Sequence, residues 1–92
     1  MRNKELIADF INGATEGKGS NLRIEGRKLI NYATVIAYRL EGNGMLLNGE
    51  NYSSTTTVHQ NVIRRHYNES SLLVEVPTED EFNQFVRKLE GK

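Results

Sequence analysis

Apolar residues recur at the spacing of an α-helix in three segments of the chain. The first segment predicts a helix that runs from an N-cap at Asn3 to Asn12. The second predicts a helix from about Thr57 to Tyr67, in which Thr57 or one of the two threonines before it caps the N-terminus. The third follows Pro77, where the Thr-x-x-Glu pattern of a capping box predicts a helix start at Thr78.

Between the first two helices the pattern changes to short apolar runs and alternation, which is typical of β-strands. Residues 22–30 predict a hairpin with a tight turn at its central glycine. Thr34 to Leu40 and Met45 to Asn48 predict a second hairpin, joined by the Gly- and Asn-containing turn 41–44. One more strand, Leu72 to Val76, is predicted between the second and third helices.

The predicted order of elements is therefore α-β-β-β-β-α-β-α. This order predicts a single α+β domain, residues 1–92, with a mainly antiparallel sheet that carries its helices on one face. Residues 13–20 contain three glycines and are predicted to form a loop. The two hairpins fix which strands are neighbours, and the position of the last strand in the sheet stays open.

Composition narrows the classes of function that fit the chain. The 92 residues carry no net charge and no cysteine, which excludes disulfides, thiolate zinc sites and a cysteine nucleophile. No apolar stretch approaches the roughly 18 residues of a membrane helix, and the N-terminus has no apolar signal core, so we expect a cytoplasmic protein with no membrane partner. Residues 1–40 are net basic and residues 67–92 net acidic. A strongly basic, nucleic-acid-binding composition is absent.

The densest run of polar side chains begins at Tyr52 and leads into the second predicted helix. Hydroxyl groups beside the free N–H groups of a helix start can hold an anion, and two arginines further along the helix can act as a clamp. The same hydroxyl residues are also common as ordinary helix caps. The candidate binding residues are Tyr52, Ser53, Thr55, Thr56, His59, Gln60, Arg64 and Arg65.

Two alternatives use other side chains. His59 and His66 are the only histidines, and their seven-residue spacing puts them roughly 10 Å apart along a helix. That spacing does not suit two ligands of one metal, and it leaves a metal-independent nuclease as a second alternative. The first alternative is a nucleic-acid-binding sheet face with stacking tyrosines. Its basic residues would be Arg23, Arg27, Lys28 and Arg39.

No cofactor, metal site or complete catalytic set is predicted. The glycine-rich segment 13–19 differs from a phosphate-binding loop because its glycine spacing is short by one and no Ser or Thr follows Lys18. The acidic run Glu79–Glu81 is explained by the positive end of the last helix dipole and its capping box.

The segment 17–60 resembles a family of small uncharacterised proteins encoded by bacteriophages, plasmids and other mobile elements. The shared pattern consists of Asn-Tyr-x-Thr-x-Ile-Ala, an Asn at the end of the next strand, and Tyr-Ser-x-Thr-Thr-x-x-His-Gln. In this sequence the pattern falls on Asn31, Tyr32, Thr34, Ile36, Ala37, Asn48, Tyr52, Ser53, Thr55, Thr56, His59 and Gln60. The resemblance implies a setting in a bacterial cell and favours residues 52–60 as a functional patch, but it implies no activity.

These observations together lead to the hypothesis of a small non-enzymatic binding protein of phage or mobile-element origin. We expect it to contact a host macromolecule, first of all a protein of a defence or replication system, with nucleic acid as the alternative partner. A homodimer is a further hypothesis, because a free sheet edge can pair with a second copy.

Overall fold

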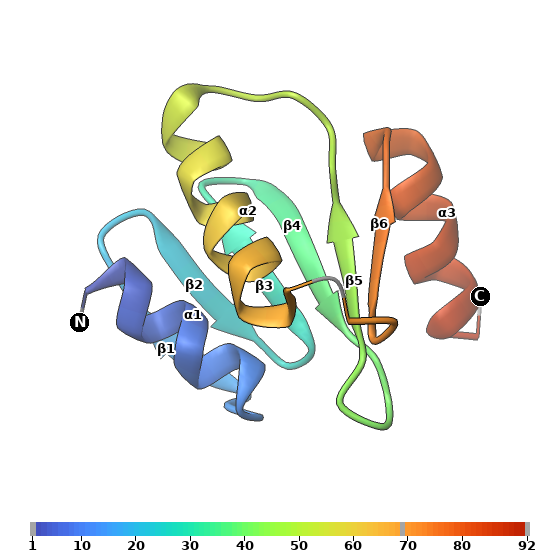
Figure 1. The fold of residues 1–92 in the computed structure, drawn as a ribbon, viewed down its shortest axis with the longest axis horizontal. Coiled ribbons are helices and arrows are strands. Elements are labelled where there is room, and N and C mark those ends of the chain that lie inside the picture. Colours follow the sequence, from blue (N-terminus) through green and yellow to red (C-terminus); the bar gives the residue numbers. More distant parts are fainter. Residues whose placement is uncertain (1, 69, 92) are drawn as a thin grey trace.

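The computed structural model describes residues 2–68 and 70–91. These residues form three helices and a six-stranded sheet whose strands follow one another in sequence order (Figure 1). All neighbouring strands are antiparallel except β5 and β6, which are parallel and joined through α2. The elements are α1 (Asn3–Ile11), β1 (Glu16–Lys18), β2 (Leu22–Glu25), β3 (Lys28–Asn31), β4 (Thr34–Arg39), β5 (Met45–Asn48), α2 (Ser54–Tyr67), β6 (Leu73–Val76) and α3 (Glu79–Leu89).

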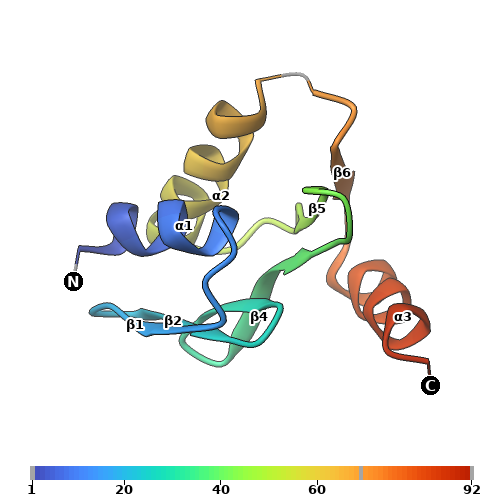
Figure 2. The ribbon, with the colours of Figure 1, turned by 90° about the horizontal axis from the view of Figure 1, so that it is seen from below.

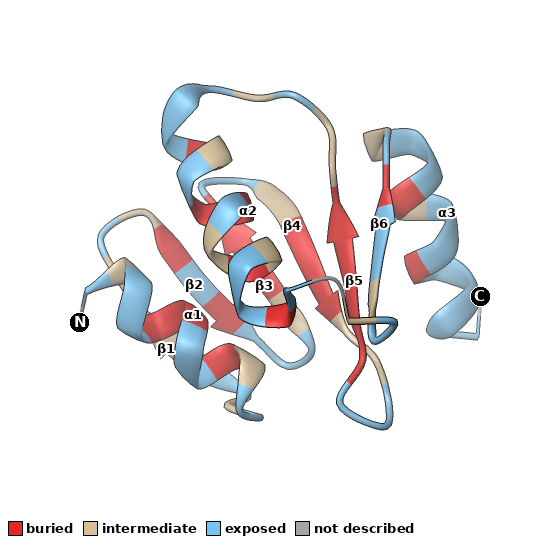
Figure 3. Ribbon diagram, in the orientation of Figure 1, coloured by how far each residue is buried: buried red, intermediate tan, exposed pale blue. Residues whose placement is uncertain are grey.

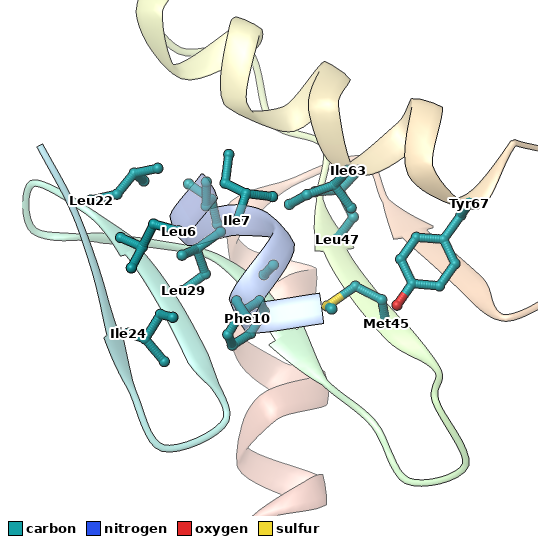
Figure 4. Packing of buried hydrophobic residues seen from close by; sticks show 12 residues of the cluster. Leu6, Ile7, Phe10, Leu22, Ile24, Leu29, Met45, Leu47, Ile63 and Tyr67 are labelled. Atoms are coloured by element: carbon teal, nitrogen blue, oxygen red, sulfur yellow. The ribbon is translucent and has the colours of Figure 1, made fainter. Parts of the chain in front are cut away.

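Both faces of the sheet carry helices, as Figure 2 shows: α1 and α2 cover one face and α3 covers part of the other. Alternation along β5 decides which side chains serve which face, because Met45 and Leu47 point to α1 and α2 whereas Leu46 points to α3. The larger core, drawn in Figure 4, brings Leu6, Ile7 and Phe10 of α1 and Ile63 of α2 against the sheet. The smaller core packs Phe82 and Val86 of α3 on Tyr38, Leu46 and Val76.

The α+β class, the single mainly antiparallel sheet and the two hairpins are confirmed. The prediction that the helices lie on one face is wrong for α3. The apolar stripe of α3 indicates that the helix packs on the sheet, but it does not indicate on which face. The short connection after β6, which contains Pro77, leads the chain to the face opposite α1 and α2. The last strand takes an edge of the sheet, beside β5.

One strand was missed, because β1 lies inside the segment predicted as a loop. Its central residue, Gly17, faces α1, where a Cβ atom would lie 2.7 Å from Leu6 Cδ1. The position that should carry an apolar side chain is therefore a glycine, and the flanking Glu16 and Lys18 are exposed. No hydrophobic alternation remains in the sequence to indicate a strand.

The part of the second sheet face that α3 leaves uncovered lies over β1 and β2 (Figure 2). Burial follows the same division, since α1-facing residues of β2 are buried and the alternating Arg23 and Glu25 are exposed (Figure 3). None of the described helices combines the length and the apolar content that crossing a membrane would require.

Candidate functional site

Helix α2 begins three residues before its predicted start, because Ser53 is the N-cap. The Ser53 hydroxyl accepts a hydrogen bond from the Thr56 backbone N–H at 3.4 Å and lies 3.2 Å from the Thr56 hydroxyl. The Thr57 hydroxyl donates to the Ser53 carbonyl at 3.1 Å. Three of the hydroxyl groups that suggested an anion site are thus engaged with the helix start itself.

Thr56 is the point at which α2 is fastened to the sheet. It is only 5% exposed, and its hydroxyl accepts a hydrogen bond of 2.7 Å from the side-chain amide of Asn31, at the end of β3. Asn31 is buried as well. A side-chain bond of this length between two buried groups fixes the N-terminus of α2 against the turn that follows β3.

A second set of polar contacts fastens α2 to the end of β5. The side-chain amide of Gln60, 2% exposed, donates to the carbonyl of Asn48 at 2.7 Å and to that of Glu50 at 3.1 Å. The Asn48 side chain donates to the Val35 carbonyl and to the Tyr52 hydroxyl. Burial raises the pKa of Tyr52, so its hydroxyl stays protonated near neutral pH. These contacts close the chain segment between β5 and α2.

His59 lies on the same buried side of α2 and is 6% exposed. Burial lowers the pKa of its imidazole, which favours the neutral ring. Its Nε2 atom and the Oδ1 atom of Asn31 are buried and have no hydrogen-bond partner among the described residues. A buried histidine in this state is a poor surface contact and a poor general acid.

The two arginines of the candidate site differ from each other. Arg64 is held by Glu75 of β6 through two bonds of 2.9 and 2.8 Å, and by the Asn61 side chain at 2.8 Å. The Arg64–Glu75 pairing lowers the pKa of Glu75 and raises that of Arg64. Arg65 is exposed. Only Arg65 of this pair projects from α2 without an ion-pair partner among the described residues.

The eight candidate residues therefore do not form one exposed surface. The assumption that the whole threonine-rich helix start faces water is wrong for Thr56, His59 and Gln60, because these three lie against the sheet. Ser53, Thr55 and Arg65 are exposed, while Tyr52 and Arg64 are half-buried. What the structure does bring together is the polar set Asn31, Asn48, Tyr52, Thr56 and Gln60, as an internal network that anchors α2.

The geometry does not assemble the residues of the two alternatives either. His59 lies on the buried face of α2, whereas His66 is exposed two turns later on the same helix. Arg39 points toward α1, where its guanidinium donates to the Phe10 and Ala14 carbonyls. Arg23 and Lys28 pair with the carboxylates of Glu25 and Glu90. Within residues 2–68 and 70–91, no group of three or more acidic or histidine side chains is placed to hold a metal ion.

The most unusual exposed residue is Tyr32, which lies in the family pattern of the sequence but was not counted among the candidate binding residues. The pairing of Asn31 with Thr34 leaves a two-residue turn, Tyr32-Ala33, between β3 and β4. Tyr32 has a φ of +56° and Ala33 does not have a positive φ, which is the pattern of a turn whose first residue is normally glycine. The residue is nevertheless a tyrosine, and it is 66% exposed.

Neighbouring groups hold this turn in place. The Tyr32 backbone N–H donates to the Asn21 carbonyl at 3.0 Å, and its carbonyl accepts a bond of 2.6 Å from Arg23 Nη1. Asn31, the residue before it, is fixed by Thr56. A bulky residue at positive φ costs of order 1–3 kcal/mol and persists only where its surroundings impose it. In the sequence, only the position of Tyr32-Ala33 between two predicted strands indicates a turn, because neither residue favours turns by itself.

One exposed neighbour of this turn comes from the start of α2. Because Asn31 and Thr56 are hydrogen-bonded, the residues next to them in sequence, Tyr32 and Thr55, belong to the same corner of the molecule. Ser54 and Val58 are exposed as well, but they lie on the side of α2 opposite to the buried Thr56 and Gln60 and so face away from the sheet. We refer to Tyr32 and Thr55 as the Tyr32 corner.

Comparisons of the chain with models of known protein families, with curated proteins and with solved structures gave no match in any of the three.

Proposed function

We propose that this is a small non-enzymatic binding protein, of phage or mobile-element origin, that contacts a host protein through the Tyr32 corner. The proposal keeps the binding function expected from the sequence and moves its centre from the buried residues of α2 to the exposed ones beside them. The observation that carries it is an exposed tyrosine in a turn position where glycine is normally required.

The stability of the fold does not explain why a tyrosine occupies the strained position 32. Gly at residue 32 would adopt the same φ at no steric cost, and the tyrosine side chain is mostly exposed, so its own burial contributes little. Exposed strained residues are concentrated at binding and catalytic sites, where the fold pays for them elsewhere. Tyrosine is also enriched among the few residues that dominate protein interfaces, because it offers a large rigid contact area.

The buried network supplies the rigidity that such a contact requires. Asn31 and Thr56 join the turn to the helix start, and Gln60 holds the helix to the end of β5. A turn whose backbone is already held by hydrogen bonds loses less conformational freedom when a partner binds. This gives the buried polar residues of the sequence pattern a role: Asn31, Thr56 and Gln60 position the contact surface and are not part of it.

A protein fits the Tyr32 corner better than a nucleic acid does. Neither of its residues is basic, and the guanidinium of Arg23 is engaged with the Tyr32 carbonyl and with Glu25. Nucleic-acid affinity comes largely from basic side chains that neutralise phosphates. An origin in a mobile element, which rests on the pattern in residues 17–60, would make the partner a protein of the host cell.

The test is affinity capture from a lysate of the host bacterium, with and without nuclease treatment, using the wild type and two variants at position 32. We expect a specific protein to be captured by the wild type and by Tyr32→Phe, which keeps the aromatic ring, and to be lost with Tyr32→Gly. Nuclease should not change the result.

Leu89→Ser is the matched control, because Leu89 is a similarly exposed apolar residue on α3. It should capture the same protein as the wild type. Folded Tyr32→Gly protein that captures the partner as well as the wild type would reject the Tyr32 corner. Capture that disappears on nuclease treatment would instead establish the nucleic-acid alternative.

A further inference from the structure

A cleft of about 880 Å³ lies at the other end of the sheet from the Tyr32 corner. Its walls come from the end of α1, the β2–β3 and β4–β5 turns, the end of α2, and Ser70 and Leu72 before β6; Figure 1 shows where these elements lie. Small-molecule sites in proteins have volumes of about 300–1,000 Å³, so the cleft is large enough for such a ligand. The titratable side chains among the described residues of its wall are Arg27, Arg39, Glu41, His66 and Tyr67.

Arg39 is a fixed positive group in this wall. Its Nη1 atom donates to the Phe10 carbonyl at 2.7 Å and to the Ala14 carbonyl at 2.8 Å, and its guanidinium carbon stands 5.2 Å from the centre of the Phe10 ring. These contacts hold the guanidinium plane in one orientation. The described hydrogen bonds use only one of its three nitrogens, and a guanidinium offers five N–H donors in all.

Arg27 brings a second guanidinium to the wall of the same cleft. Its Nη1 atom donates to the Arg39 carbonyl at 3.0 Å, across the β3–β4 pair. Burial and, next to it, the charge of Arg27 both lower the pKa of Arg39. Two like charges that repel each other have thus been brought to one cleft, which is the arrangement that an oxyanion relieves.

We propose that this cleft binds a small phosphate-bearing molecule, with its phosphate group between Arg27 and Arg39. Guanidinium groups match the oxygens of a phosphate in paired, charge-assisted hydrogen bonds, and a doubly charged group offsets two cations. Exposed polar side chains at the rim, Asn43 and His66, supply further donors toward the rest of the ligand. This inference does not depend on the Tyr32 corner.

Two features weaken the attraction of the cleft for an anion, and each leads to a specific expectation for a variant. The carbonyls of Phe10 and Ala14 offset part of the charge of Arg39, so Arg27 must contribute much of the attraction. The carboxylate of Glu41 also lines the cleft. Removing the charge of Arg27 should therefore weaken binding strongly, whereas removing the charge of Glu41 should strengthen it.

The experiment is a titration of the ¹⁵N-labelled protein with inorganic phosphate and, separately, with AMP, followed by NMR at constant pH and constant ionic strength kept with sodium chloride. We expect saturable shifts of amides in residues 39–43 and 64–67 with at least one of the two probes. Comparison of the probes distinguishes a site for the free ion from a site for a phosphate ester.

Arg27→Gln should weaken binding by about tenfold or more, and Glu41→Gln should tighten it several-fold. Arg65→Gln is the matched control, because Arg65 is an exposed arginine on α2 that does not line the cleft. The affinity of this variant for the probe should equal that of the wild type. Absence of saturable shifts with both probes would overturn the proposal. So would equal affinities of Arg27→Gln and the wild type in protein whose remaining spectrum is unchanged.

Discussion

The backbone at Tyr32 makes a prediction whose sign is opposite to the usual one. At ordinary positions a protein with glycine is less stable than the same protein with alanine by roughly 0.5–1 kcal/mol, because glycine has more conformational entropy to lose on folding. At residue 32 the φ of +56° imposes steric strain on any residue with a Cβ atom, and this strain is of order 1–3 kcal/mol. Glycine removes it and alanine does not.

Comparing Tyr32→Gly with Tyr32→Ala isolates the strain, because both variants lose the same tyrosine contacts. Glycine gains from the released strain and loses from its larger chain entropy, and the net effect should make Tyr32→Gly more stable than Tyr32→Ala by about 1 kcal/mol. For a domain of this length, such a difference corresponds to a melting temperature about 4–8 °C higher. Thermal and urea unfolding of the two variants measure it directly.

Ala33 supplies the control within the same turn, because its φ is not positive. Ala33→Gly should follow the ordinary rule and lower the stability by roughly 0.5–1 kcal/mol. If Tyr32→Ala proved as stable as Tyr32→Gly, or more stable, residue 32 would not be strained. The argument that its tyrosine is retained for contact would then lose its basis.

Two further predictions concern the buried side of α2. Burial lowers the pKa of His59 below its ordinary value of 6.5, so the unfolded chain binds more protons than the folded protein as the pH falls below that value. The free energy of unfolding should therefore decrease from pH 7 to pH 5, and it should decrease by less in His59→Asn. Urea unfolding at the two pH values measures both changes. Gln60→Ala leaves the Asn48 and Glu50 carbonyls without their donor, so it should destabilise the fold by about 2–3 kcal/mol. Gln84→Ala, on the exposed face of α3, is the control and should stay within about 0.5 kcal/mol of the wild type. A pH dependence identical in His59→Asn, or a Gln60→Ala protein as stable as Gln84→Ala, would contradict the respective prediction.

Local chemistry was enough to predict several elements of the fold. The turn between β4 and β5 has positive φ at Gly42 and Asn43, as its composition indicates. The Thr78 hydroxyl accepts from the Glu81 N–H, as the capping-box pattern predicts. These features are decided by residues within a few positions of each other, and therefore the sequence pattern is sufficient to locate them.

The side of the sheet that α3 covers depends instead on distant residues. Its apolar stripe is equally suited to either face, and the choice rests on Tyr38 and Leu46, which form the floor beneath Phe82. In the same way β1 is held by pairing with β2 and by the fit of Gly17 under Leu6, neither of which leaves an apolar pattern. Tertiary packing outweighs local signals at both places.

The candidate site divides for the same reason. Thr55 and Thr56 are adjacent and chemically identical, yet one is exposed and the other is bonded to Asn31, 25 residues earlier in the chain. A helix turns by about 100° per residue, so the position of the sheet decides which threonine is buried. Tyr32 could not be found by propensity, because its turn is imposed by Asn21 and Arg23 and not by its own residue type.

The central claim is that this fold holds Tyr32 in a costly conformation in order to present it to a partner. The most direct measurement is capture of the partner from nuclease-treated lysate by wild-type and Tyr32→Gly protein, with the melting temperature of each recorded on the same samples. The account predicts that Tyr32→Gly remains fully folded and loses the partner. A folded Tyr32→Gly protein that retains the partner at wild-type level would contradict it.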